Sequence, residues 1–148
     1  MRLYPVLRPF LFALGAEAAH RATIAALKFL PLHSAHLPPS VKTTLAGLDF
    51  PSPVGLAAGF DKDAEVAAEM LTLGFGFVEV GTLTPRAQAG NAKPRLFRLA
   101  EDRAVINRMG FNNEGQAAAF MRLSGCSRLG GPIGVNIGAN KDSPDRVG

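Results

Sequence analysis

The sequence has no tryptophan, a single tyrosine and a single cysteine in 148 residues. One cysteine, Cys126, excludes a disulfide scaffold and a cysteine-cluster metal site. No motif of a reactive cysteine surrounds it, so we interpret it as structural. The three histidines lack the spacing of metal ligands, and we expect no metal site. No run of about 18 apolar residues is present, so no membrane-spanning helix is predicted.

Charge is also sparse. Charged residues make up 19% of the chain and its formal net charge is +4, which is too small and too scattered to indicate nucleic-acid binding. Neither a Gly-x-Gly-x-x-Gly motif nor a Walker-type loop occurs, which argues against nicotinamide and nucleoside-triphosphate sites. The 47% of hydrophobic residues is typical of a globular domain. An eight-unit βα barrel needs roughly 200–250 residues, so a barrel interpretation makes this chain part of a larger unit.

Two short amphipathic helices are predicted in the first thirty residues. The first carries an apolar stripe at helical spacing, made of Leu3, Val6, Leu7, Phe10, Leu11 and Leu14. The second runs from about Glu17 to Leu30, with Ala19, Thr23, Ala26, Leu27 and Leu30 expected on one face. A linker follows over residues 31–42. The pair either caps the domain core, which the pattern favours, or lies on a membrane surface with its arginines and lysine facing anionic head groups.

Residues 43 to 82 predict a βα repeat. Residues 43–50 are typical of a short β-ribbon, and residues 54–59 of a buried parallel strand. Asp61 and Asp63 precede an apolar-periodic helix that is expected to end at Gly74. Residues 77–82 form the next strand. Strand, helix and strand in about thirty residues indicate a parallel sheet.

The remaining chain predicts a long excursion and a third strand. Residues 84–107 contain a hairpin, and a loop of this length inside a compact domain is usually functional. Asn113 to Gln116 has the form of a capping box that opens a helix, whose apolar residues are Ala117, Phe120, Met121 and Leu123. Residues 133–137 are the third strand.

Polar residues follow each predicted parallel strand, where such folds place their ligands. Lys62 either neutralises an anion or a reduced cofactor ring, or pairs with Asp61 or Asp63; the sequence does not decide between them. The amides from Asn107 to Asn113 suit either a ligand with donors and acceptors or a turn. Asn136, inside an apolar strand, needs a hydrogen-bond partner, and a ligand is one candidate.

Five motifs together resemble one known family. They are Gly55–Asp63, Gly74–Arg86, Pro94–Leu99, Ile106–Asn113 and Gly134–Asp142. Each alone is weak, but in register they resemble the quinone-dependent class (class 2) of the dihydroorotate dehydrogenases, over nearly the whole chain. The resemblance implies an α/β fold, a TIM (β/α)8 barrel of which roughly the first three βα units are present in residues 43–148. The two-helix segment over residues 1–30 precedes them.

The resemblance also implies a function. It implies oxidation of dihydroorotate to orotate with FMN as prosthetic group, in de novo pyrimidine (UMP) biosynthesis. Electrons would leave to a membrane quinone between the two N-terminal helices. Peripheral contact of residues 1–30 with the cytoplasmic side of the inner membrane is implied too, and no nucleic acid is expected as a partner.

The family's site residues carry over by motif position. The cofactor-binding residues implied are Ala58, Gly59, Phe60, Asp61, Lys62, Thr82 and Asn136. The substrate-binding residues implied are Lys62, Asn107, Arg108, Met109, Gly110 and Phe111. The family's catalytic base is a serine expected beyond Gly148, as is the flavin phosphate site, so no catalytic residue is expected in this chain.

We therefore expect a fragment that is inactive alone. Two alternatives remain open: a membrane-surface or interaction module that uses the N-terminal helices, and another FMN-dependent barrel oxidoreductase.

Overall fold

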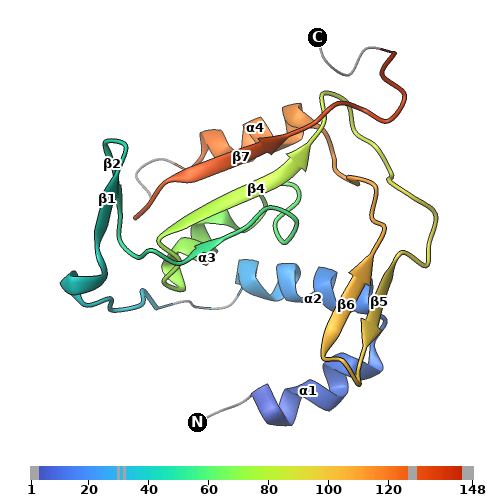
Figure 1. Ribbon diagram of the computed structural model, residues 1–148, viewed down its shortest axis with the longest axis horizontal. Coiled ribbons are helices and arrows are strands. Elements are labelled where there is room, and N and C mark those ends of the chain that lie inside the picture. Colours follow the sequence, from blue (N-terminus) through green and yellow to red (C-terminus); the bar gives the residue numbers. More distant parts are fainter. Residues whose placement is uncertain (1–3, 30, 32, 127–129, 145–148) are drawn as a thin grey trace.

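A three-stranded parallel sheet lies at the centre of the molecule (Figure 1). The computed structural model describes residues 4–29, 31, 33–126 and 130–144. The strands are β3 (Gly55–Leu56), β4 (Phe77–Leu83) and β7 (Ile133–Ile137), in the order β3-β4-β7. Val78 pairs with Ile133 and Val80 with Val135, and the register shifts between Val80 and Leu83. The predicted second and third strands are confirmed.

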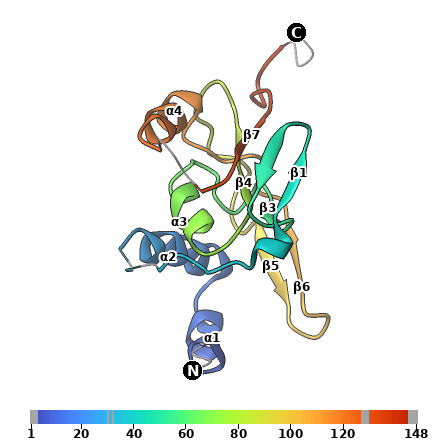
Figure 2. The ribbon, with the colours of Figure 1, turned by 90° about the vertical axis from the view of Figure 1, so that its left-hand side faces the viewer.

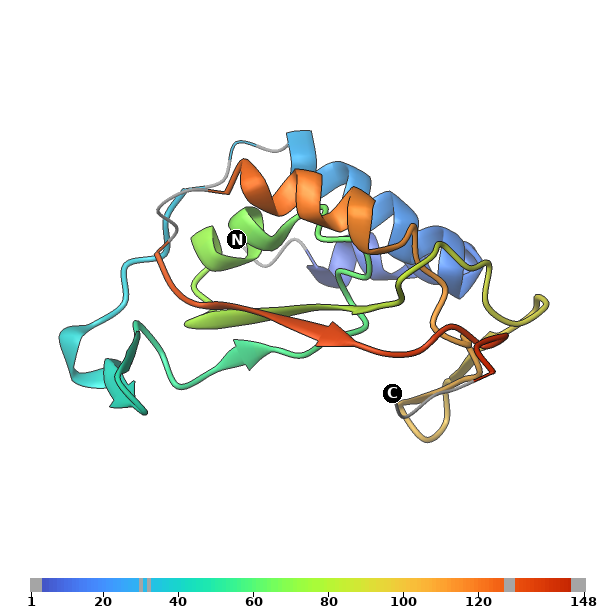
Figure 3. The same cartoon turned by 90° about the horizontal axis from the view of Figure 1, so that it is seen from above.

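Helices cover one face of this sheet (Figure 3). They are α2 (Ala16–Phe29), α3 (Ala67–Thr72) and α4 (Gln116–Ser124); α1 (Tyr4–Ala13) precedes them, and a 3-10 turn spans Pro39–Val41. Val78 and Val80 of β4 are fully buried beneath the helices. The core around them consists of Ile24, Leu27, Ala64, Val66, Ala67, Met70, Val78, Val80, Leu83 and Ala119. Burial of these apolar side chains is the main term that holds the layers together.

Two antiparallel hairpins flank the sheet, as the sequence predicts. One pairs β1 (Thr43–Leu45) with β2 (Leu48–Phe50), and the other pairs β5 (Leu96–Leu99) with β6 (Ala104–Asn107). The second hairpin lies beside α1 and α2 at the opposite end of the molecule from β1 and β2 (Figure 1).

The two N-terminal helices form as predicted, but their faces differ from the prediction. In α2 the buried residues are Ala19, Ile24 and Leu27, whereas Ala26 is exposed. The predicted face was wrong by part of a turn because Ile24, the larger apolar side chain, packs into the core in place of Ala26. Leu30 lies outside the described residues.

Helix α1 keeps its apolar stripe exposed. Phe10 is 70% and Val6 62% exposed, and Figure 2 shows α1 set apart from the sheet. The guanidinium of Arg98 on β5 donates hydrogen bonds to the carbonyls of Leu11, Phe12 and Leu14, at the C-terminal end of this helix. The helix is thus held at its end by the hairpin, while its apolar side remains open. None of the helices in the described ranges has the length and apolar character that crossing a bilayer requires.

The first parallel strand is shorter than the predicted range 54–59. Only Gly55 and Leu56 pair with β4, and the chain then turns through Gly59 to Asp61. The carboxylate of Asp61, which is 1% exposed, accepts hydrogen bonds from the backbone N–H groups of Glu65 (2.7 Å) and Val66 (2.9 Å). The turn that this carboxylate stabilises delays α3 until Ala67.

The predicted capping box was also wrong. Gly115 is the N-cap of α4 and no side chain caps the helix. The Asn113 side chain instead accepts hydrogen bonds from the backbone N–H groups of Gly115 (2.8 Å) and Thr84 (3.2 Å). Ala119 faces the core and Leu123 packs against it, while Phe120 and Met121 are 68% and 73% exposed.

An ion pair fixes α2 to the excursion between β4 and α4. The Arg95 guanidinium, 6% exposed, donates to Glu17 at 2.6 and 3.2 Å, and to the carbonyls of Ala89 (2.5 Å) and Asn91 (3.0 Å). The hydrogen bond from Arg95 is the main cause that lowers the pKa of Glu17. The two bonds to Glu17 therefore join α2 to the excursion, while the two bonds to Ala89 and Asn91 fix the excursion around the same guanidinium.

We predict that Asp61→Ala lowers the free energy of unfolding by about 3 kcal/mol, since two buried backbone donors lose a charged acceptor. Urea unfolding followed by circular dichroism measures this. Asp102→Ala, at an exposed turn of the β5–β6 hairpin, is the control and should change little. Equal stability of the two variants would contradict the role given to Asp61.

We predict that Glu17→Gln costs roughly 1–2 kcal/mol near neutral pH. Because folding lowers the pKa of Glu17 from 4.5, its contribution is present above that pH and is lost as the pH falls through the folded-state value. The stability difference between the wild type and Glu17→Gln should therefore shrink in acid. A difference that stays constant from pH 7 to pH 3 would refute this.

Candidate active site

A cavity of about 630 Å³ opens at the carboxyl ends of β3 and β4. Its wall comes from α2, from the segment after β3, from β4, and from the β5–β6 hairpin with the segments that flank it. The lining residues are Glu17, His20, Ala58, Gly59, Phe60, Lys62, Gly81, Thr82, Asn91, Leu96, Asn107, Arg108, Met109, Gly110, Phe111 and Asn112. The structure thus brings together both predicted groups of residues, with Asp61 and Asn136 as the exceptions.

The segment after β3 gives the cavity an open floor. Gly59 has a φ of +107°, and a Cβ atom built on it would meet no atom within 4 Å. Its N–H donates to the carbonyl of Gly81 at 2.8 Å, which keeps the segment aligned with β4 beyond the strand itself. A flat molecule can approach the backbone here without meeting a side chain.

Lys62 is one of two cations that the described residues place in the cavity wall, with Arg108. Its Nζ donates to the carbonyl of Gly59, and no described ion pair joins it to Asp61 or Asp63. Burial lowers the pKa of Lys62, so the cation has lost part of its hydration. Of the two alternatives for Lys62, the geometry favours charge directed at the cavity over an aspartate pair.

Thr82 and Asn136 form a polar link between β4 and β7. The Thr82 hydroxyl donates to Asn136 Oδ1 at 2.6 Å, and Asn136 Nδ2 donates to Glu79 Oε1 at 3.1 Å. Asn136 therefore has protein partners and does not line the cavity, while Thr82 does. Asp61 also stays outside the lining, because its carboxylate is used in the turn before α3.

The amide-rich segment from Asn107 to Asn112 is held in a tight backbone form. Gly110 and Phe111 have φ values of +72° and +52°, and a Cβ on Gly110 would lie 2.8 Å from the Asn91 side chain. Asn91 N–H donates to the Met109 carbonyl at 3.0 Å, and Gln88 Nε2 donates to the carbonyls of Gly110 and Phe111. The segment is thus a fixed wall of the cavity.

Arg108 lines the cavity, but its guanidinium is engaged elsewhere. It donates to the Pro94 carbonyl at 3.0 and 3.3 Å. Arg108 therefore helps to hold the wall in place, and Lys62 is the cation better placed for a ligand.

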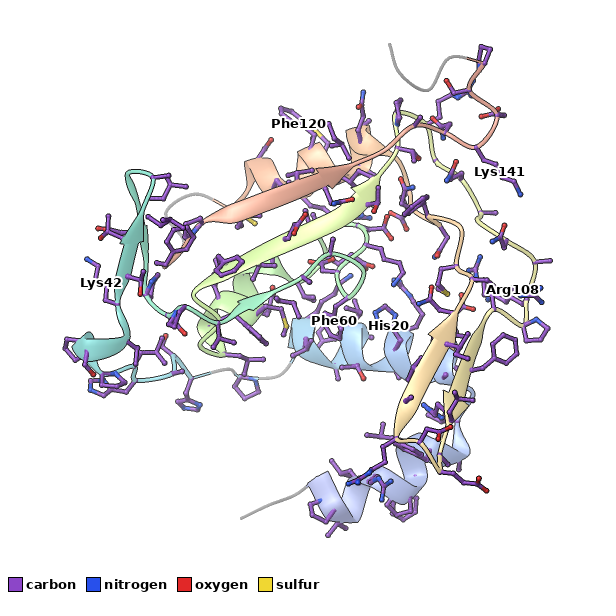
Figure 4. The ribbon with its side chains drawn as sticks, in the orientation of Figure 1. His20, Lys42, Phe60, Arg108, Phe120 and Lys141 are labelled. Atoms are coloured by element: carbon purple, nitrogen blue, oxygen red, sulfur yellow. The ribbon has the colours of Figure 1, made fainter. Side chains whose placement is uncertain are left out.

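Sequence reasoning missed the contribution of α2. His20 donates from Nε2 to the Phe60 carbonyl at 2.7 Å, and its ring packs edge-on against Phe60 with centroids 5.3 Å apart (Figure 4). Burial lowers the pKa of His20. The sequence held one signal: Glu17 and His20 continue the helical spacing of Ile24 and Leu27, so two polar residues extend a buried stripe.

Sequence reasoning also missed three further lining residues, Gly81, Asn91 and Leu96. Asn112 lines the cavity too and belongs to the amide-rich stretch that the sequence singled out. The described part of the chain contains no group of three or more histidine, cysteine or acidic side chains able to hold a metal ion.

Comparison with known proteins identifies relatives of this chain. The family model for dihydroorotate dehydrogenase matches residues 40–147. A protein of Erythrobacter litoralis named "Dihydroorotate dehydrogenase (quinone)" is 60% identical over 146 residues, 98% of this chain and 43% of the relative. A protein of the same name from Sphingopyxis alaskensis is 61% identical over 148 residues, 97% of this chain and 41% of the relative.

Two crystal structures from Eimeria tenella have the same fold. Dihydroorotate dehydrogenase in complex with ferulenol matches with a TM-score of 0.81 and 46% identity, over 88% of this chain and 37% of that one. The ligand-free form matches with a TM-score of 0.82 and 44% identity, over 89% and 39%. The chain thus spans about two fifths of the length of the curated relatives. On the match of the family model over residues 40–147, this chain belongs to the dihydroorotate dehydrogenase family.

Proposed function

We propose that this chain supplies the N-terminal part of the active site of an enzyme that oxidises dihydroorotate to orotate in de novo pyrimidine biosynthesis. FMN would be its prosthetic group and a membrane quinone its electron acceptor. The observation that carries the proposal is the single cavity wall shared by Gly59, Lys62, Thr82 and the segment from Asn107 to Asn112. The names of the relatives support the substrate and the acceptor.

The cavity fits a flavin. Ala58 and Gly59 leave the floor flat, and Thr82, whose hydroxyl hydrogen points to Asn136, keeps its oxygen lone pairs as acceptors for a ring N–H. Lys62 offers positive charge to a ring that becomes anionic on reduction. When bound, FMN accepts the hydride from the substrate. These residues bind and orient the ring; Asn136 acts through Thr82, and Asp61 through the turn that places Lys62.

The substrate side of the cavity is the segment from Asn107 to Phe111. Its amides and backbone groups offer both donors and acceptors, which a pyrimidine dione requires. The Lys62 ammonium attracts the carboxylate of such a substrate. We assign neither a proton-accepting group nor a flavin phosphate site to the described residues of this chain; both stay predictions from the family resemblance.

The N-terminal helices suit a peripheral membrane contact. Phe10, Val6 and Leu7 of α1 are exposed on the helix that Arg98 holds by its end, and Arg8 packs over Phe12. An apolar side next to basic residues is typical of a helix that lies in a membrane surface. We propose that α1 binds the cytoplasmic face of the inner membrane, where the quinone would arrive. The same exposed stripe is what favours the alternative, a membrane-surface module.

We predict that Lys62→Ala strongly lowers flavin-dependent activity in a chimera in which residues 1–148 replace the matching part of the Erythrobacter litoralis relative. The parent chimera should be yellow and should reduce a quinone analogue with dihydroorotate. Loss of a preorganised charge should lower kcat/KM about 100-fold or more. Lys42→Ala, at an exposed position just before β1 (Figure 4), is the matched control. A colourless parent chimera, or full turnover with Lys62→Ala, would overturn the proposal.

We predict that the 148-residue chain alone binds FMN weakly and does not oxidise dihydroorotate, because this chain is assigned neither a base nor a phosphate site. Dye reduction by dihydroorotate in the presence of added FMN is the assay. Turnover above the protein-free blank would refute the assignment.

We predict that α1 directs binding to anionic vesicles. Phe10→Glu should lower the vesicle-bound fraction about 10-fold, because it removes a large apolar side chain from the bilayer and adds a repelled charge. Phe120→Glu, which changes an equally exposed phenylalanine on α4, is the matched control and should leave binding unchanged. Flotation with phosphatidylglycerol vesicles measures both; equal losses would reject a specific role for α1.

A further inference from the structure

A second, much smaller cavity adjoins the candidate active site. Its volume is about 30 Å³, and we call it the annex. Its lining residues are Glu17, His20, Arg21, Ile24, Phe60, Lys62, Asp63, Glu65, Met109 and Asn112. His20, Lys62 and Asn112 also line the large cavity, so the annex lies directly behind part of its wall. Most of its lining is polar, unlike that of cavities that remain dry.

The side chain of Asn112 points to a ligand in this space. Its Oδ1 atom is buried and receives no hydrogen bond from the described residues. A buried carbonyl oxygen without a donor is rare in folded proteins, because it has lost its hydration without compensation. The volume of the annex matches the space that one water molecule occupies.

Lys62 offers the complementary group. An ammonium carries three N–H donors, and one of them goes to the Gly59 carbonyl. His20 donates from Nε2 to the Phe60 carbonyl, which leaves Nδ1 of the neutral ring as an acceptor. A water molecule can accept from Lys62 and donate to both Asn112 and a second acceptor, which gives it the three bonds typical of a buried water.

We propose that the annex binds one water molecule, which accepts a hydrogen bond from Lys62 Nζ and donates one to Asn112 Oδ1. Asn112 is then a positioning residue: through the water it holds the ammonium between the Gly59 carbonyl and the large cavity, with its third N–H directed to that cavity. The site exists whether or not the large cavity binds FMN, so it extends beyond the proposed function.

Several charged groups near Lys62 also influence its pKa and must be considered when Lys62 is titrated. From α2 and from the segment before α3, these are Glu17, His20, Arg21, Asp61, Asp63 and Glu65, with Arg95 and Glu114 further along the chain. Burial raises the pKa of Asp63 and lowers that of Lys62, so both groups are short of hydration. An internal water compensates the ammonium, and its loss should lower the pKa of Lys62 further.

The test is NMR on the isotope-labelled 148-residue chain, without FMN or dihydroorotate. The pKa of Lys62 is measured from its Cε and Nζ shifts, and the water from its cross-relaxation with the Asn112 side-chain amide. We expect Asn112→Leu to lower the pKa of Lys62 by about 1 unit and to remove the water signal. Asn112→Asp, of nearly the same shape, should raise that pKa by a similar amount.

Asn107→Leu is the matched control, because Asn107 lines the large cavity but not the annex. It should leave the Lys62 titration and the water signal in place. If Asn112→Leu does not fold, the proposal is tested by the change in the Lys62 pKa in Asn112→Asp and by the water signal of the wild type. An unmoved Lys62 pKa in Asn112→Asp, or no bound water in the wild type, overturns the proposal and leaves the proposed function untouched.

Discussion

The ion pair between Glu17 and Arg95 is the constraint on which the candidate site depends. Arg95 is nearly fully buried, so its charge requires the carboxylate and the two carbonyls that surround it. One partner lies on α2 and the others lie on the excursion that also holds the segment from Asn107 to Asn112. The cavity wall therefore exists only when the N-terminal helices and the excursion are docked together. Arg98, which donates to the carbonyls at the C-terminal end of α1, makes a second connection between the N-terminal helices and this excursion.

The position of Lys62 also depends on a small number of contacts. Its turn is stabilised by Asp61, and among the described residues its ammonium donates to the Gly59 carbonyl alone. A cation held by so few fixed groups stays available to a ligand, whereas an aspartate partner would have cancelled its field. The separation of roles between two neighbouring residues, one structural and one facing the cavity, explains why both occur in one motif.

The order of strands and helices could be predicted from the hydrophobic periodicity and the turn residues. The family motifs predicted most of the residues that line the cavity. What failed depended on tertiary contacts. The face of α2 was misjudged because Ile24, not Ala26, meets the core. The cap of α4 was misjudged because Asn113 bonds to Thr84, which is distant in sequence. His20 could not be placed, since nothing local shows that its helix packs against the segment after β3.

The strand β7 leaves one edge of the sheet without a neighbour in the described part of the chain. Beside it, Ile137 and Val135 are exposed and join Phe120 and Met121 in an apolar hollow of about 810 Å³. The unpaired N–H and C=O groups of this edge, next to exposed apolar side chains, form a surface to which another β-strand can pair. Self-association of the chain through added strands is the consequence to be expected of this surface when no other segment covers it.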